Sequence, residues 1–358
     1  MSTPNMAEIA RKAGVGKATV SLALRNDPRL RRETRERIQR IAEKMGYRAN
    51  AVVSHLMAQL RSSRDPKYQA TIGIVNASNS RDSIETNYTF RTWMGGLRSR
   101  CSELGYGTDE FWLHEPGVGP GRLREILAAR NIRGVIIGAV LELRQLPPEF
   151  DILWHDLACV VVGIRPERPA LHFACNDQFS TAMQTASELR KLGYQRPGLV
   201  IDHAIEENLD HRFSAGFYAG QAEEELQRRV PIFNFRTAER PAFQKWIEKF
   251  QPDVVVCTHP EIREWLESLG LQSPRDIGLV HLDLTPELVG WSGMNQNNDA
   301  VGAFAVDLVV GQLHRNECGI PEHPKCMMIE SHWVPGTTLR DLSATRTPAR
   351  GKPKPRRK

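Results

Sequence analysis

The first side chains in the sequence that could do chemistry are basic and polar groups on one short segment near the N-terminus. From Lys17 to Leu24 the chain reads KATVSLAL, in which Val20 and Ala23 fall on one side of a helix. The other side carries Lys17, Ala18, Ser21, Leu22 and Arg25. Such a small, polar and basic surface suits the major groove of DNA, where side chains reach the base edges. The segment therefore predicts recognition of a nucleic acid.

Two further helices must position this segment. An apolar face over 6–13 predicts a first helix that ends at Gly14, and a three-residue turn then leads into the second helix. A third helix over 32–44 has apolar residues at helical spacing, beginning at Ile38. This arrangement is typical of a helix-turn-helix unit, whose second helix enters the major groove.

Charge is distributed unevenly along the 358 residues, whose net charge is +6. Residues 1–68 carry a net charge of +9 and residues 344–358 carry +7, so the middle of the chain is acidic, at −10. Clustered Lys and Arg neutralise phosphates, so we expect the basic ends to meet a polyanion; the alternative is solvated surface charge. The arginines expected to attract phosphates around the third helix are Arg31, Arg32, Arg35, Arg37 and Arg40.

The runs MAEIARKAGVGKATVSLALRN (6–26) and ETRERIQRIAEKMGYRAN (33–50) resemble the DNA-binding head of the lactose-repressor/galactose-repressor (LacI/GalR) family. The resemblance implies that Lys17 and Ala18 face bases, with Leu22 further along the same surface. It also implies phosphate contacts from Thr19, Ser21, Tyr47 and Asn50. Leu22 stands where many family members have arginine, so it can pack on a thymine methyl group but cannot bond guanine.

A short hinge helix is expected after the head. Asn50 can cap it, and its apolar stripe consists of Val53, Leu56, Met57 and Leu60. Two such stripes in a symmetric dimer could pair and insert an apolar wedge into the minor groove, and the resemblance implies that Leu56 is the wedge residue. The alternative is a helix that packs on the body of the protein.

From Thr71 onward, short β-rich runs alternate with amphipathic helices. Strands are expected at 71–75, 134–138, 159–163, 197–201, 254–257 and 277–281, with helices at 90–104, 181–192 and 213–227. This order predicts parallel sheets in two lobes. The predicted fold is therefore α/β: an all-α helix-turn-helix head and hinge helix, joined to a two-lobed body like that of periplasmic binding proteins.

Polar residues directly after the predicted strands are candidate ligand contacts, because parallel sheets bind ligands beyond the carboxyl ends of their strands. In the first lobe these are Asn76 and Ser78. In the second lobe His259 and Asp283 follow strands in the same way. The resemblance gives Asp283 a role in binding a sugar hydroxyl and adds Arg212 and Gln296, and these residues would hold a small effector, expected to be a sugar or sugar derivative. The alternatives are a turn aspartate for Asp283 and a structural loop histidine for His259.

Several classes of function are disfavoured. The sequence has no GxSxG, GxxxxGK[ST] or HExxH motif, no CxxC pair, no membrane-length apolar run and no secretion signal. We therefore expect no catalytic residue, metal or cofactor, and reduced cysteines in a cytoplasmic protein. Two rivals are weighed: a solute-binding receptor, and an α/β enzyme with an appended DNA-binding module.

The predicted organisation is a DNA-binding head at 1–49, a hinge helix and linker at 50–68, a two-lobed effector-binding and dimerisation domain at 69–340, and a disordered basic tail at 341–358. The expected function is that of a homodimeric transcriptional regulator, and the resemblance implies that it is a repressor. It would bind a near-palindromic operator in double-stranded DNA, and the effector would modulate its affinity.

Overall fold

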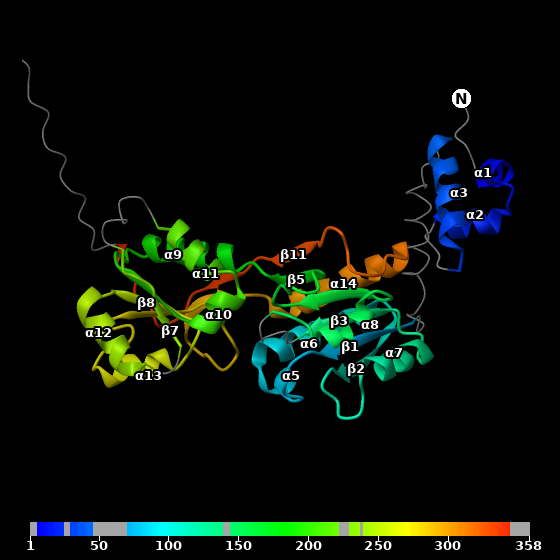
Figure 1. The fold of residues 1–358 in the computed structure, drawn as a ribbon. Helices are drawn as coiled ribbons and strands as arrows, with labels where there is room; N and C mark the ends of the chain where they lie inside the picture. Colours follow the sequence, from blue (N-terminus) through cyan, green and yellow to red (C-terminus); the bar gives the residue numbers. More distant parts are fainter. Residues whose placement is uncertain are drawn as a thin grey trace, which may run out of the picture. The chain divides into compact units, whose positions relative to one another are not determined.

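The computed structural model describes residues 6–24, 29–45, 70–138, 144–221, 229–236 and 239–343. The chain forms two compact units, the first comprising Met1–Ala174 with Asp299–Met327 and the second comprising Cys175–Asn298 with Met328–Lys358. Each unit contains one six-stranded sheet (Figure 1). The tertiary arrangement is therefore that of an α/β protein with two separate sheets, as the sequence predicts.

The head consists of α1 (Met6–Ala13), α2 (Lys17–Leu24) and α3 (Arg32–Lys44), with the bounds that periodicity predicts. Its buried apolar residues come from all three helices, and they are Ile9, Ala10, Ala13, Val20, Ala23, Ile38 and Ala42. Because all the buried residues are small or aliphatic, the three short helices can approach closely enough to share one core.

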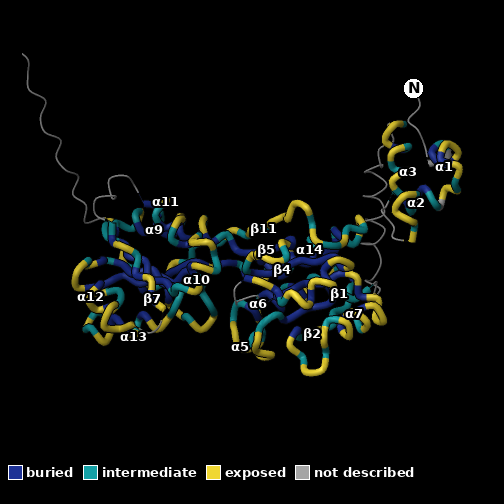
Figure 2. The backbone as a smooth tube through the Cα atoms, viewed as in Figure 1, coloured by how far each residue is buried: buried dark blue, intermediate teal, exposed yellow. Residues whose placement is uncertain are grey.

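The first sheet has the strand order β11-β5-β4-β3-β1-β2. Its strands are β1 (Ala70–Asn76), β2 (Tyr106–Trp112), β3 (Gly134–Gly138), β4 (Ala158–Val162), β5 (His172–Asn176) and β11 (Cys326–Ile329). The pairs formed among β1 to β5 are all parallel. Strands β3, β4 and β5 are buried along their whole length, as expected for a parallel sheet covered on both faces (Figure 2).

Helices α6 (Tyr88–Glu103), α7 (Pro120–Ala129) and α14 (Asn298–Arg315) belong to the first unit, with the short α5 (Ser83–Thr86), η1 (Pro148–Phe150) and α8 (Asp151–Trp154). Helices α6 and α14 cross where their backbones nearly touch. A Cβ atom added at Gly96 would lie 1.8 Å from the carbonyl oxygen of Asp299, and one at Gly302 would lie 1.9 Å from that of Trp93. Only glycine fits at these two positions.

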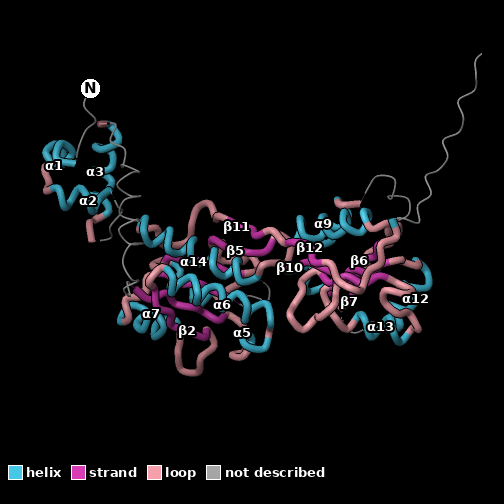
Figure 3. Tube along the Cα trace, turned by 180° about the vertical axis from the view of Figure 1, so that it is seen from behind, coloured by secondary structure: helices cyan, strands magenta, loops and turns pink. Residues whose placement is uncertain are grey.

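The second sheet has the strand order β12-β10-β9-β8-β6-β7, in which β12 runs antiparallel to β10. Figure 3 draws its strands in magenta. Its strands are β6 (Pro197–Asp202), β7 (Phe233–Phe235), β8 (Val254–Cys257), β9 (Gly278–His281), β10 (Ser292–Asn295) and β12 (His332–Val334). The carboxyl ends of the parallel strands β6, β8, β9 and β10 meet at one edge of this sheet.

The second unit also contains five described helices: α9 (Gln178–Lys191), α10 (His203–Asn208), α11 (Arg212–Ala219), α12 (Arg240–Phe250) and α13 (Ile262–Ser268). Helix α11 ends at Ala219, so the helix predicted to continue to residue 227 is shorter than expected. Gly220 follows, and a Cβ atom there would come within 2.5 Å of the Met183 carbonyl oxygen on α9. Residues 222–228 lie outside the described residues.

All six predicted strands are present, although their ends shift by up to one residue. The six strands that the sequence pattern missed are β2, β5, β7, β10, β11 and β12, which are short, polar or aromatic. Four tryptophans are at most 6% exposed and pack in the cores, and they are Trp93, Trp246, Trp265 and Trp291.

Candidate nucleic-acid interface

Helix α2 has an inner face that fixes its orientation and an outer face that is available for contact. Val20 and Ala23 are fully buried, whereas Lys17 is exposed and Leu22 is half-buried. Thr19 is also half-buried, and the Val20 amide donates a hydrogen bond to the Gly16 carbonyl at 3.1 Å. The side chains of Ala18 and Ser21 lie outside the described residues. Apolar packing on its inner face therefore holds the segment predicted to read bases, and its outer face presents the Lys17 cation.

The turn that leads into α2 depends on a left-handed glycine. Gly14 has φ +66°, a conformation that other residues adopt at a cost, and the Val15 amide donates to the Ala10 carbonyl at 3.0 Å. This bond closes the end of α1 as a glycine C-cap does. The sequence prediction of a helix end at Gly14 is confirmed.

Helix α3 clamps the other two helices through side-chain bonds to their last carbonyl groups. Arg37 Nη1 donates to the Ala13 carbonyl at 3.1 Å, and Gln39 Nε2 donates to the Ala23 carbonyl at 2.9 Å. These carbonyls lie at helix ends, where no intrahelical donor exists. The two clamps set the angle at which α2 is presented, and no local pattern in the sequence indicated them.

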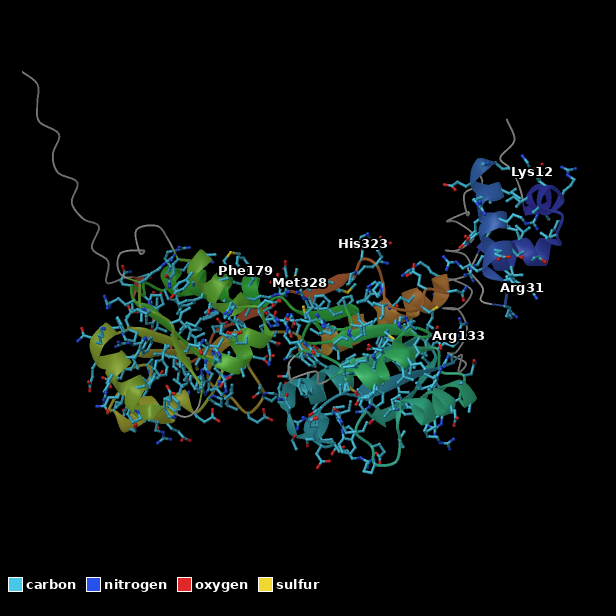
Figure 4. All side chains as sticks on the ribbon, in the orientation of Figure 1. Lys12, Arg31, Arg133, Phe179, His323 and Met328 are labelled. Atoms are coloured by element: carbon cyan, nitrogen blue, oxygen red, sulfur yellow. The ribbon has the colours of Figure 1, made fainter. Side chains whose placement is uncertain are left out.

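The arginines expected to attract phosphates do not all remain available for that role. Arg37 is engaged by its clamp, and Arg32 pairs with Glu36 at 2.7 Å between Nε and Oε1. The Arg32 hydrogen bond and charge hold the pKa of Glu36 below its ordinary value. Arg31 and Lys12 are exposed (Figure 4). Together with Lys17, they are the better candidates for phosphate contact.

Four of the predicted DNA contacts fall outside the described residues, namely Tyr47, Asn50, Val53 and Leu56. The hinge helix that contains the last two therefore stays a prediction.

In the first unit, the candidate effector residue Asn76 is 5% exposed and its side chain is occupied within its own loop. Its Nδ2 donates to the carbonyls of Ser80 and Arg81 at 3.3 and 3.0 Å, and its Oδ1 accepts from the Ser78 amide at 3.0 Å. This geometry brings Asn76 and Ser78 together and orders the turn after β1. Asn76 thus acts first as a structural residue of that loop.

In the second unit, Asp283 and Gln296 belong to one hydrogen-bonded network at the carboxyl edge of the sheet. Gln296 Nε2 donates to the Leu282 carbonyl at 2.7 Å, and Asn298 Nδ2 donates to Asp283 Oδ1 at 2.9 Å. Asn176 Nδ2 bridges them, donating to the Gln296 carbonyl at 2.8 Å and to Asn298 Oδ1 at 3.0 Å. Neither Asn176 nor Asn298 was named as a candidate from the sequence. For Asn298, the polar run NQNND (295–299) at the end of β10 was a usable signal.

His259 and Arg212 lie near the same part of the fold but outside that network. The Thr258 hydroxyl and His259 Nδ1 are 3.0 Å apart, and the imidazole packs edge-on against Phe235 with ring centroids 5.5 Å apart. Arg212 begins α11, and its Nη1 lies 3.8 Å from both Cys175 Sγ and Met328 Sδ.

His281, the last residue of β9, was also missed. It is 4% exposed, and its Nδ1 accepts a hydrogen bond from the Asp283 amide at 3.2 Å. Burial lowers the pKa of His281 to about 4, because desolvation of the cation outweighs the backbone hydrogen bonds. The ring is therefore neutral near pH 7 and orders the turn that carries Asp283.

Within the described ranges, no cluster of three or more His, Cys, Asp or Glu side chains is arranged to hold a metal ion. Among those same residues, no helix has the length and apolar character needed to cross a membrane. Four of the six cysteines are buried, and burial raises the pKa of the Cys101 thiol to about 12.

Comparison with known proteins identifies the head. Residues 5–50 match the family model of bacterial regulatory proteins of the lacI family. The HTH-type transcriptional regulator MalR of Staphylococcus xylosus is 24% identical over 276 residues, which cover 75% of this chain and 78% of that relative.

Solved structures of similar fold include a complex of the transcriptional regulator CelR with cellobiose. It has 17% sequence identity and a TM-score of 0.55, and the match covers 94% of this chain and 99% of that one. The lac repressor dimer bound to operator and the anti-inducer ONPF has 15% identity and a TM-score of 0.55, covering 95% and 100%.

The resemblance predicted from the sequence is therefore confirmed. Residues 5–50 form a DNA-binding head of the lacI family, and most of the chain is similar to a transcriptional regulator that carries such a head.

Proposed function

We propose that this protein represses transcription by binding, as a homodimer, to a near-palindromic operator in the cytoplasm, with an effector that changes its operator affinity. The observation that carries the proposal is α2, whose inner face is sealed by the core while exposed Lys17 projects from the other side. The clamps from Arg37 and Gln39 hold that helix in one orientation. A rigid and exposed recognition helix is what base readout in a groove requires.

The proposed organisation assigns the reading of DNA to residues 1–49 and the hinge and linker to 50–68. Effector binding and dimerisation are assigned to 69–340, and 341–358 form a basic tail. Each head reads one half-site, so the symmetry of the dimer requires near-palindromic symmetry in the DNA. Phosphate contacts supply much of the affinity, and contacts from Lys17, Ala18 and Leu22 select the sequence.

The effector is proposed to be a sugar or sugar derivative that binds at the carboxyl edge of the second sheet. Asp283 supports this, because a carboxylate oxygen can accept hydroxyl hydrogen bonds beyond the one from Asn298. Gln296, His259 and Arg212 are proposed as further contacts. Among the similar structures, CelR is bound to cellobiose, and the lac repressor is bound to its anti-inducer.

Selection of operators from randomised duplex DNA tests the central claim. We expect a near-palindromic consensus, with affinity that falls steeply as salt rises because phosphate contacts release counterions. Absence of sequence preference at low salt would refute the proposal.

The hinge is tested by Leu56→Gly, with Ala58→Gly as a control that has a similar cost in helix propensity. We expect Leu56→Gly to weaken specific binding far more than non-specific binding, because the wedge acts only in the kinked operator complex. If Leu56→Gly weakens specific and non-specific binding equally, or if Ala58→Gly has the same effect as Leu56→Gly, Leu56 is not a wedge residue.

A panel of sugars, titrated into the operator complex of the full chain, tests the effector. We expect one class to change operator affinity without being consumed. Turnover of a sugar would instead support an enzyme with an appended DNA-binding module. No change with any member, together with intact operator binding, would limit the proposal to its DNA-binding half.

A further inference from the structure

The first sheet has a second polar edge, opposite to the one that carries Asn76. Because β3, β4 and β5 are parallel, their amino ends meet at this edge, where His172 begins β5. The same edge receives the first residue of β1, Ala70. A hollow there is lined by Arg133, His172, Gln312, Glu317, Cys318 and Lys325.

His172 presents a fixed donor to this hollow. Its ring is 5% exposed, and its Nδ1 accepts a hydrogen bond from the Lys325 backbone amide at 2.8 Å. A backbone amide can only donate, so the proton of the neutral imidazole resides on Nε2. Among the described residues that Nε2–H makes no hydrogen bond, and it is not one of the fully buried atoms without a partner, so it is open to solvent at the hollow. A ligand in the hollow can therefore reach it.

Two cations, Lys325 and Arg315, and one carboxylate, Glu317, act on this ring. Glu317 is the acidic residue that lines the hollow, and its carboxylate is held by Arg315 through two bonds of 2.6 and 2.8 Å. Lys325 Nζ is further from it, at 3.8 Å, and exposed Arg133 makes no ion pair within the described residues. Burial and the neighbouring Lys325 charge lower the pKa of His172, so the ring donates a hydrogen bond without carrying a charge.

A second buried polar side chain completes the floor. Gln312 is 3% exposed, and its Nε2 donates to the Cys159 carbonyl at 3.4 Å. This bond fixes the carboxamide on α14 beside the amino end of β4. The hollow therefore combines two buried polar side chains, His172 and Gln312, with exposed cations at its rim. Figure 4 labels Arg133 and His323, which lie on its exposed rim.

We propose that this hollow is a binding site for the oxyanion group of a small molecule, a phosphate or a carboxylate, held by His172 Nε2–H and the Lys325 ammonium. Arg133 adds attraction from the rim. The site is separate from the proposed effector residues, which lie at the opposite edge of the first sheet and in the second unit. An oxyanion suits it because such groups accept charge-assisted hydrogen bonds from both an ammonium and an imidazole N–H.

The test uses the full chain without DNA, with ¹⁵N-labelled histidine, at constant ionic strength. Inorganic phosphate and acetate are titrated in separate arms, and the His172 signal is assigned with a His172→Asn variant. We expect saturable shifts of the His172 Nε2 resonance with at least one anion, and an upward shift of its pKa when that anion is bound. The arm that saturates identifies the chemistry as phosphate or carboxylate.

Lys325→Gln is expected to weaken anion binding about tenfold or more, because it removes one charge-assisted hydrogen bond. Arg133→Gln should weaken it less, since it acts from the rim. The matched control is Arg122→Gln, an exposed arginine paired with Glu125 on α7, which should leave binding unchanged.

Three results would overturn the proposal. The first is that neither anion perturbs the His172 signal. The second is that the control variant reduces anion binding as much as Lys325→Gln does, which would indicate general charge attraction. The third is that Lys325→Gln leaves anion binding intact but lowers the affinity for non-specific DNA, which would mean that these cations contact DNA phosphates. None of these results bears on operator selection or on the sugar response, so both parts of the proposed function are judged independently.

Discussion

The head and the carboxyl edge of the second sheet hold polar residues in opposite ways. On α2, Lys17 projects outward with only apolar residues behind it. At the sheet edge, Asp283 and Gln296 are bound into a network with two asparagines. A helix keeps its outer side chains available, because its backbone N–H and C=O groups hydrogen-bond to one another. An edge built from several loops must satisfy its polar groups through one another.

This difference determines how each region responds to change. Deleting a side chain from the outer face of α2 removes a contact with DNA but leaves no orphaned partner. Deleting one from the edge network leaves a buried donor without its acceptor, which destabilises the unit as well as altering any ligand site. Four substitutions probe this contrast, from the largest expected effect to the smallest.

Ile38→Ala should abolish specific operator binding. Ile38 is fully buried in the head, and such a truncation costs about 2–5 kcal/mol, which is comparable to the stability of a domain of this size. Circular dichroism and calorimetry should show the loss of the head with an unchanged thermal midpoint for the body. The control is Ile152→Ala, which truncates a half-exposed isoleucine in the first unit. A head that stays folded contradicts the assigned core.

Lowering the pH should destabilise the second unit through His281. Its pKa is about 4 in the folded protein and about 6.5 when unfolded, so between these values the unfolded chain binds the extra proton. Stability therefore falls as pH drops from about 6.5 to about 4, by up to about 3 kcal/mol from this group. Urea unfolding across that range measures the loss.

His281→Leu should flatten that pH dependence. His323→Leu serves as the control for replacing a histidine, because the His323 side chain is 90% exposed. If both variants keep the wild-type slope, other groups govern the acid response.

Asp283→Ala should lower the stability of the second unit by about 1–3 kcal/mol, because it removes the acceptor for buried Asn298. Asp283→Asn retains an acceptor oxygen and should recover part of the loss. Operator affinity without effector should stay within about threefold of wild type, while the effector response is blunted. An unchanged effector response would remove Asp283 from the ligand site and leave it a structural role.

Lys17→Ala should raise the operator Kd about tenfold with no change in thermal stability, and should reduce the slope of affinity against salt. Arg32→Ala removes the same charge from the head, but that arginine pairs with Glu36, so its effect should be smaller. Equal effects would mean that the head attracts DNA by net charge alone, without a defined recognition face.

Much of the fold was predictable because its signals are local. Helices α1, α2 and α3 begin and end where apolar periodicity and Gly14 place them. The fully apolar strands β3 and β8 were found for the same reason. Strands β5 and β10 were missed because HFACN and SGMN show neither alternation nor a continuous apolar run. Their pairing depends on neighbours that are distant in the sequence.

The candidate sites were less predictable. The sequence named Asp283 and Gln296 and the resemblance gave them roles, but neither indicated that Asn176 joins them across about 120 residues. Arg37 illustrates the same limit in the head. It was expected to attract phosphates, yet a neighbouring helix end supplied a nearer acceptor.

The sequence alone determined the three helices of the DNA-binding head, the positive charge that attracts the head to DNA, and the alternation of strands and helices that builds two parallel sheets. Those properties depend on side chains a few positions apart, so they are written in local spacing. Tertiary contacts decided which arginines remain free, which polar groups bind one another and where His172 keeps an unused donor. Each of these outcomes is a competition for hydrogen-bond partners, and the competitors meet only after the chain has folded.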